Sequence, residues 1–281
     1  IRSEIIKTTL HNGGHLASNL GTVELTLAIH YVFDAPEDKL IFDVGHQCYT
    51  HKLITGRRDR FGTLRRQNGF PSHTESEYDT FDAGHSSTAI SAALGLARAR
   101  DRKGEDYHVI AIVGDGAMGG GMAFEAINDA GASRETKLIV VLNDNEMSIS
   151  KNIGGINMLL SKLRARKMYA ISNKSGKKVL EKIPVVGSKI IKIVQRMKQG
   201  IKQLIIPKMF FEDIGFKYLG PIDGHNIEDM ELIFKRAKEL DEPVLIHVLT
   251  KKGKGYTPAE DEPDRFHATS PFYIETGKPK K

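Results

Sequence analysis

Two polar triplets, each following a strand-like run, constrain the fold of this chain most. Residues 114–116 read Gly-Asp-Gly after the β-branched run 108–113, and residues 143–145 read Asn-Asp-Asn after the run 138–142. Between the two triplets, apolar residues recur on one face of a predicted helix: Met122, Ala126, Ile127 and Ala130. A strand–helix–strand unit of this kind places both triplets at the carboxyl ends of parallel strands, where open α/β sheets bind ligands.

The chemistry of these triplets favours a hard cation that carries phosphates, because oxygen ligands converge beside a glycine-rich turn. The same segment also spells G-x-G-x-x-G through Gly114, Gly116 and Gly119, which is typical of a nicotinamide or flavin site. Asp115 argues against that alternative, since its charge would repel a pyrophosphate unless a divalent metal lay between them. A plain capping role in a tight turn would explain Asp115 but not the distant Asn-Asp-Asn.

Strand and helix patterns alternate along the rest of the chain. We expect strands at Leu40–Val44 and Pro243–Thr250, and helices at Thr22–Tyr31, from Ser86 onward and at Ile227–Leu240. The inward residues of these helices are predicted to be Val23, Leu27 and Tyr31 in the first, Ile90, Ala93, Leu94 and Ala97 in the second, and Met230, Ile233, Phe234 and Ala237 in the third. The expected fold class is α/β, a mostly parallel sheet with helices on both faces.

A basic segment interrupts this pattern at about residues 151–208. It holds 15 lysines and arginines against one acidic residue, Glu181, within a chain whose net charge is +6. Tyr169 is its only aromatic residue, and its basic residues alternate with apolar ones, which favours amphipathic helices with solvated basic faces over a nucleic-acid surface. We therefore expect one domain over residues 1–281 with a basic helical insertion and no nucleic-acid partner.

Length and composition narrow the class of protein. The 281 residues, 40% of them hydrophobic, suffice for one large domain or two small ones. No apolar run approaches the roughly 18 residues of a membrane span, and no signal-peptide pattern opens the chain. The single cysteine, Cys48, is predicted to be an apolar filler in a reducing, cytoplasmic compartment. Because the first residue is Ile, we expect a fragment or a trimmed product.

Four histidines stand beside glycine at predicted loop positions: His15, His46, His85 and His225. Each one alone is more typical of a structural loop, but their recurrence indicates a shared site, since histidine can move a proton near neutral pH. Zinc is a poor explanation, because no pair has i, i+4 helical spacing or partner cysteines. His267 lies beyond the last strand and could fold back on the site.

Motifs along nearly the whole chain resemble the thiamine-diphosphate enzymes and, more closely, the transketolase-like 1-deoxy-D-xylulose-5-phosphate synthase family. The stretches that carry the resemblance are residues 14–21 (GHLASNLG), 43–47 (DVGHQ), 75–79 (ESEYD), 84–88 (GHSST), 114–118 (GDGAM), 143–150 (NDNEMSIS) and 220–225 (GPIDGH). The Gly-Asp-Gly with its downstream Asn marks the superfamily, and the histidine motifs mark the synthase. The resemblance implies a thiamine-diphosphate-binding fold.

The resemblance also implies roles for individual residues. The expected Mg²⁺ ligands are Asp115, the Asn145 side chain and the Met147 carbonyl. The expected cofactor contacts are His46, Gly84, His85, Ser86, Gly116, Ala117, Asn145 and Tyr256. His15 is similar to the histidine that works on bound substrate and intermediates, and His267 is similar to a second one.

The implied reaction is that of a transferase of isoprenoid and thiamine precursor biosynthesis. It condenses pyruvate with D-glyceraldehyde 3-phosphate to 1-deoxy-D-xylulose 5-phosphate and CO2, in an enzyme expected to be a homodimer at full length. Two departures stand out. Residues 119–121 are Gly-Gly-Gly where the family usually has Thr-Ala-Gly, which we expect to loosen the helix start. From the resemblance we also expect that the pyrimidine-binding domain with its activating glutamate, and the C-terminal domain, lie outside these 281 residues.

Three functions therefore remain open from the sequence. The first is a diphosphate half-site of the synthase, inactive until the missing domain is supplied in the same or a partner chain. The second is the N-terminal subunit of a split transketolase. The third is a non-catalytic module that binds the cofactor or a partner chain.

Overall fold

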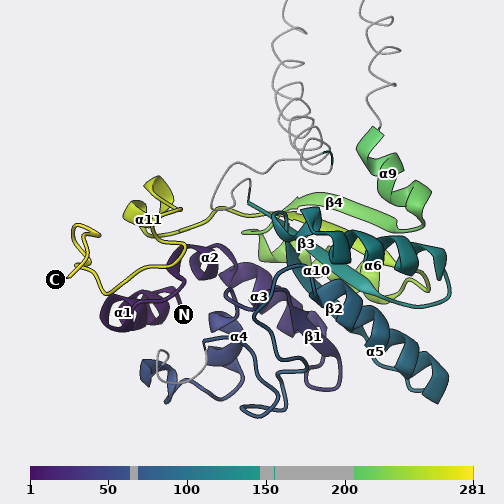
Figure 1. Cartoon of the computed structure of the whole chain (residues 1–281), viewed down its shortest axis with the longest axis horizontal. Coiled ribbons are helices and arrows are strands. Elements are labelled where there is room, and N and C mark those ends of the chain that lie inside the picture. Colours follow the sequence, from purple (N-terminus) through teal and green to yellow (C-terminus); the bar gives the residue numbers. More distant parts are fainter. Residues whose placement is uncertain (64–68, 146–154, 156–205, 281) are drawn as a thin grey trace, which may run out of the picture.

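Five parallel strands form a single sheet at the centre of the computed structural model, which describes residues 1–63, 69–145, 155 and 206–280 (Figure 1). The strands lie in the order β1-β2-β3-β5-β4. Their bounds are Lys39–Phe42 (β1), Val109–Gly114 (β2), Ile139–Asp144 (β3), Lys217–Asp223 (β4) and Val244–Leu249 (β5). The predicted parallel α/β class is therefore confirmed, and the two strands of the central strand–helix–strand unit are neighbours in the sheet.

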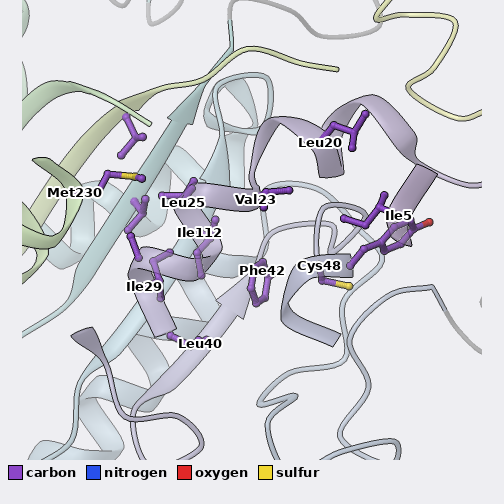
Figure 2. Close-up of a cluster of buried hydrophobic side chains, with 14 of the residues drawn as sticks. Ile5, Leu20, Val23, Leu25, Ile29, Leu40, Phe42, Cys48, Ile112 and Met230 are labelled. Atoms are coloured by element: carbon purple, nitrogen blue, oxygen red, sulfur yellow. The ribbon is translucent and has the colours of Figure 1, made fainter. Parts of the chain in front are cut away.

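Helices cover both faces of the sheet, which explains why β2 and β3 are apolar at nearly every position. One face packs against α3 (Val23–Val32) and α10 (Ile227–Lys238). Figure 2 shows this core, where Leu40 and Phe42 of β1 and Ile112 of β2 lie close to α3 residues such as Ile29. The opposite face packs against α5 (Ala89–Lys103), α6 (Gly121–Ala132) and α9 (Ile206–Ile214).

The inward faces of the helices were largely predicted. The four α5 residues, the α10 residues Met230, Phe234 and Ala237, and the α6 residues Ala126, Ile127 and Ala130 are buried. The prediction was wrong for two residues: Tyr31 is 69% exposed at the end of α3, and Met122 is 52% exposed at the start of α6. Both lie in the terminal turn of their helix, where the neighbouring residues Val32 and Ala123, and not Tyr31 and Met122, pack against the core.

Two element boundaries also differ from prediction. Helix α5 begins at Ala89 and not at Ser86, because Ser87 has a φ of 70° and so lies in the left-handed region. Strand β1 ends at Phe42, and Val44 has a φ of 59° in the turn that follows. Both deviations fall where the chain leaves the sheet edge or enters a helix.

Several elements carry no strong periodic signal and were not predicted. They are α1 (Arg2–Asn12), α2 (Leu16–Gly21), α4 (Tyr49–Ile54), α11 (Thr257–Asp261), β4 and the 3-10 turns Phe61–Thr63 and Ala117–Gly119. Every residue of α2 is buried, including the polar Ser18 and Asn19, so its polar residues do not mark a solvent-facing side. Strand β4 contains a register shift between Leu219 and Ile222 that breaks its alternation.

The C-terminal segment returns to the N-terminal part of the chain. An antiparallel bridge joins Gly14 and Thr269, and the Ala17 N–H donates to the Phe266 carbonyl at 2.9 Å. α1, α11 and the C-terminus gather at one end of the molecule, on the left in Figure 1. Residues far apart in the sequence are thereby brought to the same end of α2.

The predicted basic insertion at about 151–208 lies outside the described residues, apart from residue 155 and the first residues of α9. Its predicted helices stay a prediction. Among the described helices, none combines the length and the apolar character needed to cross a membrane.

Candidate functional site

A cavity of about 570 Å³ lies at the carboxyl edge of the sheet, within the size range of small-molecule sites. Residues at or just after the carboxyl ends of β1, β2, β3 and β5 line it, because parallel strands end at the same edge of the sheet. The lining residues are His15, Ser18, Asp43, Val44, His46, Gln47, Gly84, His85, Ser86, Gly114, Asp115, Gly116, Ala117, Asn143, Asn145, Lys252 and His267.

The two polar triplets meet in this cavity. Asp115 is buried, and its N–H donates to the Asn143 carbonyl at 3.1 Å, which ties the end of β2 to the end of β3. The Asn143 Oδ1 accepts the Thr250 hydroxyl at 2.6 Å, which extends the connection to the end of β5. Asn145 lines the same cavity, whereas Met147 lies outside the described residues. One carboxylate and two carboxamides thus converge, a donor set that suits Mg²⁺.

The loop 84–88 is secured by a carboxylate at the end of β1. Asp43 accepts the N–H groups of Ser87, Thr88 and Ala89 at 2.9–3.1 Å, at the N-terminus of α5. Burial raises the pKa of Asp43, and these three hydrogen bonds oppose that rise. Asp43 therefore fixes the loop that carries Gly84, His85 and Ser86 into the cavity.

Gly120, in the glycine run at 119–121, lies directly against the 84–88 loop. The Ser87 hydroxyl donates to the Ala117 carbonyl at 2.8 Å, so the 84–88 loop packs directly on the turn after β2. A Cβ on Gly120 would lie 2.0 Å from the Ser87 Oγ. Helix α6 begins immediately afterwards, at Gly121. An Ala at position 120 would require the Ser87 side chain to move.

Three histidines gather at one side of the cavity. The ring centroids of His15 and His46 lie 5.4 Å apart, those of His15 and His267 5.9 Å, and those of His46 and His267 5.1 Å. Burial lowers the pKa of all three, to about 3 for His46 and to about 4 for His267. At neutral pH each ring is therefore uncharged, with one nitrogen able to donate a proton or hydrogen bond and the other able to accept.

His46 bears the clearest mark of a ligand-binding residue. Its Nδ1 is buried and has no hydrogen-bond partner within the described residues. The Asn19 amide donates to the His46 carbonyl at 2.7 Å, and the preceding Gly45 has a φ of +88° with Pro71 packed against it. The backbone is thus fixed while a polar side-chain atom stays unsatisfied. Since an orphaned buried group costs free energy, a bound ligand is the natural partner.

Lys252 is the cavity residue that sequence reasoning missed most clearly. It is 7% exposed, and burial lowers its pKa while Asp115 and Asp264 oppose that shift. The Lys/Gly-rich stretch 251–255 reads as a solvated turn in the sequence, so nothing local marks one lysine as buried. Ser18, Asp43, Val44 and Gln47 also line the cavity without having been predicted as site residues.

Two predicted residues are not brought to the cavity. The Tyr256 hydroxyl donates to the Ile274 carbonyl at 2.8 Å, and its ring packs against Phe266 and Phe272. His225 lies between Glu24 and Lys251 and does not line the cavity. His267, in contrast, does fold back onto it.

Two further predictions concern cysteine and metals. Cys48 is fully buried, as predicted for an apolar filler, and burial raises its thiol pKa to about 12. Among the described residues, no group of three or more His, Cys, Asp or Glu side chains could hold a metal ion. The Mg²⁺ hypothesis therefore rests on one carboxylate combined with amide and carbonyl oxygens.

Comparison with known proteins gives a consistent picture. The family model described as 1-deoxy-D-xylulose-5-phosphate synthase matches residues 1–250. The synthase of Caldanaerobacter subterraneus subsp. tengcongensis is 57% identical over 99% of this chain and 45% of the relative, and that of Desulforudis audaxviator is 55% identical over 99% and 44%. The chain thus spans less than half the length of these relatives.

Solved structures add evidence on the fold alone. Transketolase from Campylobacter jejuni aligns with a TM-score of 0.63 at 19% identity, over 95% of this chain and 38% of that one. Transketolase from Leishmania mexicana aligns with a TM-score of 0.61 at 18% identity, over 99% and 40%. The parallel sheet and its helices are therefore transketolase-like.

Proposed function

Because the chain belongs to the 1-deoxy-D-xylulose-5-phosphate synthase family, we propose that it supplies the Mg²⁺–diphosphate half of a thiamine-diphosphate site. That site would condense pyruvate with D-glyceraldehyde 3-phosphate to 1-deoxy-D-xylulose 5-phosphate and CO2. The observation that carries the proposal is the convergence of Asp115, Asn145, Lys252 and neutral histidines in one cavity at the carboxyl edge of the sheet.

The donor set fits the cofactor's anionic end. Asp115 and Asn145, with the Met147 carbonyl, would hold Mg²⁺, and the turn at Gly116 and Ala117 would hold the diphosphate. The buried ammonium of Lys252 supplies a positive charge in the same cavity, which supports binding of a multiply charged anion. A dinucleotide site explains this combination less well, because it needs no carboxylate in the phosphate turn.

The chain's own side chains would then bind, orient and move protons. Thiamine diphosphate, when bound, supplies a nucleophilic ring carbon and an electron sink for loss of CO2 from a 2-keto acid. His46 and the loop Gly84–Ser86 would contact the cofactor, and the unpartnered Nδ1 of His46 supports this role. His15 and His267, uncharged at neutral pH, are suited to donate a proton to a substrate oxygen or to accept one.

The remaining half of the site would come from the pyrimidine-binding domain, in the same or a partner chain, and the family's homodimeric form is part of the proposal. The chain alone should therefore be inactive. An N-terminal subunit of a split transketolase is a weaker alternative, since the transketolases share under 20% identity and the synthases over 50%. A non-catalytic binding module would leave the neutral histidine cluster without a use.

The proposal is tested by calorimetric titration of Mg²⁺–thiamine diphosphate into the 281-residue chain, alone and mixed with the pyrimidine-binding part of the synthase. Asp115→Ala should weaken binding by about 100-fold, equivalent to about 2.7 kcal/mol, because the diphosphate loses its bridging cation. Asp129→Ala is the matched control, since Asp129 is an exposed carboxylate paired with Arg98. Equal affinities for the Asp115 variant and the unchanged chain would refute the Mg²⁺ assignment.

A further inference from the structure

His225 ends a sequence motif, residues 220–225, to which the proposed function gives no role. It lies in the turn between β4 and α10, outside the cavity. The turn is fixed to the sheet, because the His225 N–H donates to the Asp223 carboxylate at 2.9 Å and the Gly224 N–H donates to the Leu249 carbonyl at 2.8 Å. The imidazole is therefore presented from a rigid position beside the end of β5.

Both ring nitrogens of His225 have partners, and these partners fix its tautomer. The Lys251 N–H donates to Nε2 at 2.9 Å, and Nδ1 lies 3.0 Å from the Glu24 Oε2. A main-chain N–H can only donate, so Nε2 must be the acceptor and Nδ1 must carry the hydrogen. His225 thus receives a hydrogen bond from one segment and gives one to another.

Glu24 is itself held as an acceptor. Arg2 contacts both Glu24 oxygens, at 2.6 Å for Nη2 and Oε2, and the Arg2 Nε donates to the Lys254 carbonyl at 2.8 Å. Burial would raise the pKa of Glu24, but the hydrogen bonds from Arg2 and His225 outweigh burial and lower it to about 2. A chain of contacts therefore runs from α1 through Glu24 and His225 to the turn at 251–254.

That turn carries Lys252 into the cavity. On one side of Lys252, the Lys251 N–H is held by His225, and on the other, the Gly253 N–H donates to the Ala17 carbonyl at 2.8 Å. Gly253 has a φ of +75°, and a Cβ there would lie 2.3 Å from the Ala259 backbone, so only glycine fits at this position of the turn. The direction of the Lys252 side chain is set by these two backbone anchors.

We propose that His225 is a positioning residue that holds the Lys252 ammonium in the cavity through its hydrogen bond to the Lys251 N–H. The inference rests on the proposed function, in which Lys252 contributes to binding of the cofactor diphosphate. His225 does not touch the ligand. It acts because a backbone shift at residue 251 moves the root of the Lys252 side chain.

Two substitutions separate the two hydrogen bonds of His225. In His225→Asn the short amide can replace Nδ1 toward Glu24 but cannot reach the Lys251 N–H. In His225→Gln the longer side chain can place its Oε1 near the position of Nε2. We expect His225→Asn to weaken binding of Mg²⁺–thiamine diphosphate about 10-fold, and His225→Gln to restore it to within about 2-fold.

The experiment measures the affinity for Mg²⁺–thiamine diphosphate by calorimetry, and it measures backbone protection at residues 251–255 by amide hydrogen exchange. The same measurements are made on Lys252→Met alone and on Lys252→Met combined with His225→Asn. Exchange should rise in His225→Asn and not in His225→Gln, and His225→Asn should have no further effect on affinity once Lys252 is Met. Equal affinities for the Asn and Gln variants, or additive effects with Lys252→Met, would overturn the inference. If Lys252→Met leaves affinity unchanged, the diphosphate assignment itself fails, which distinguishes the two proposals.

Discussion

Histidines outside the cavity and histidines inside it have different neighbours. Outside, four buried or half-buried rings contact carboxylates, in the pairs His51–Asp79, His108–Asp38, His225–Glu24 and His247–Asp144. His30 joins the first of these pairs through a hydrogen bond of 2.9 Å between its Nε2 and the His51 Nδ1. Inside, the rings of His15, His46 and His267, three of the four histidines that line the cavity, contact one another. Among the described residues, none of these three lies within ion-pair distance of a carboxylate.

The difference indicates which histidines serve the fold and which serve a ligand. A buried imidazole paired with a carboxylate regains the hydrogen bond that it lost to water. His46 regains none at Nδ1, and burial lowers its pKa to about 3. A buried nitrogen without a hydrogen-bond partner lowers the stability of the ligand-free protein. Groups that destabilise the fold in this way are expected at functional sites. Three predictions test this division, from the largest expected effect to the smallest.

His15→Ala should abolish most activity while leaving the fold intact. In the chain mixed with the pyrimidine-binding and C-terminal domains of the synthase, formation of 1-deoxy-D-xylulose 5-phosphate should fall roughly 10²–10⁴-fold, the usual cost of removing a positioned acid or base. Thermal unfolding of the variant should stay close to that of the unchanged chain. Full turnover by the isolated 281-residue chain would contradict the half-site proposal, and a large loss of stability in His15→Ala would contradict the division between the two histidine groups.

Asp79→Asn should have the opposite profile, with a large loss of stability. The Asp79 carboxylate is fully buried and accepts hydrogen bonds from His51 at 2.9 Å, Arg57 at 2.5 Å and the Ser72 N–H at 2.9 Å. Removing one charge from a buried cluster typically costs about 3–5 kcal/mol. Urea unfolding would measure the loss.

The matched control for Asp79→Asn is Glu231→Gln, which removes an exposed carboxylate 2.6 Å from the Lys235 ammonium on α10. An exposed i, i+4 pair of this kind is worth about 0.3–0.5 kcal/mol. Similar losses in the two variants would show that burial of the Asp79 cluster adds nothing to stability.

The cavity histidines His46 and His267 should also make the free energy of unfolding decrease at acidic pH. The pKa values of His46 and His267 are lowered in the folded chain to about 3 and about 4, from an unfolded value of about 6.5. The unfolded chain therefore binds more protons between these values, and the free energy of unfolding decreases as pH falls from about 6.5 toward 4. Each such proton contributes at most about 1.4 kcal/mol per pH unit.

His46→Gln removes one of these titrations, so its free energy of unfolding should depend less steeply on pH between 6.5 and 4.5. Urea unfolding at a series of pH values would measure the slope, and His46→Gln combined with His267→Gln should flatten it further. An unchanged slope in both variants would show that the buried, unpaired histidines do not control acid stability.

Local sequence patterns predicted the elements that the core fixes. The β-branched runs became β2 and β3, and the two triplets that follow them meet in the cavity, because parallel strands bring their carboxyl ends to one edge. Patterns failed where a long-range contact decides the outcome. His225 follows a glycine as His46 does, yet its ring contacts Glu24, 201 residues away in the sequence, and lies outside the cavity.

The burial of Lys252 could not be predicted from the sequence either. Lys251, Lys252 and Lys254 stand in one short turn, but only Lys252 is buried among the three, because the backbone anchors on either side of it direct one side chain inward. Helix α2 was missed because all six of its residues are buried, so its polar residues Ser18 and Asn19 do not mark a solvent-facing side. In both cases the tertiary surroundings, and not the local propensity, decide the structure.

The bridge between Gly14 and Thr269 has a consequence for the time at which the site comes into being. A ribosome makes the chain from its N-terminus at roughly 5–20 residues per second, and early segments can begin to fold before late ones exist. The strands of the sheet are complete at Leu249, yet Lys252 and His267 have still to follow. The sheet can therefore assemble during synthesis, whereas the cavity gains its full lining only after the segment around residue 269 has emerged and closed onto Gly14.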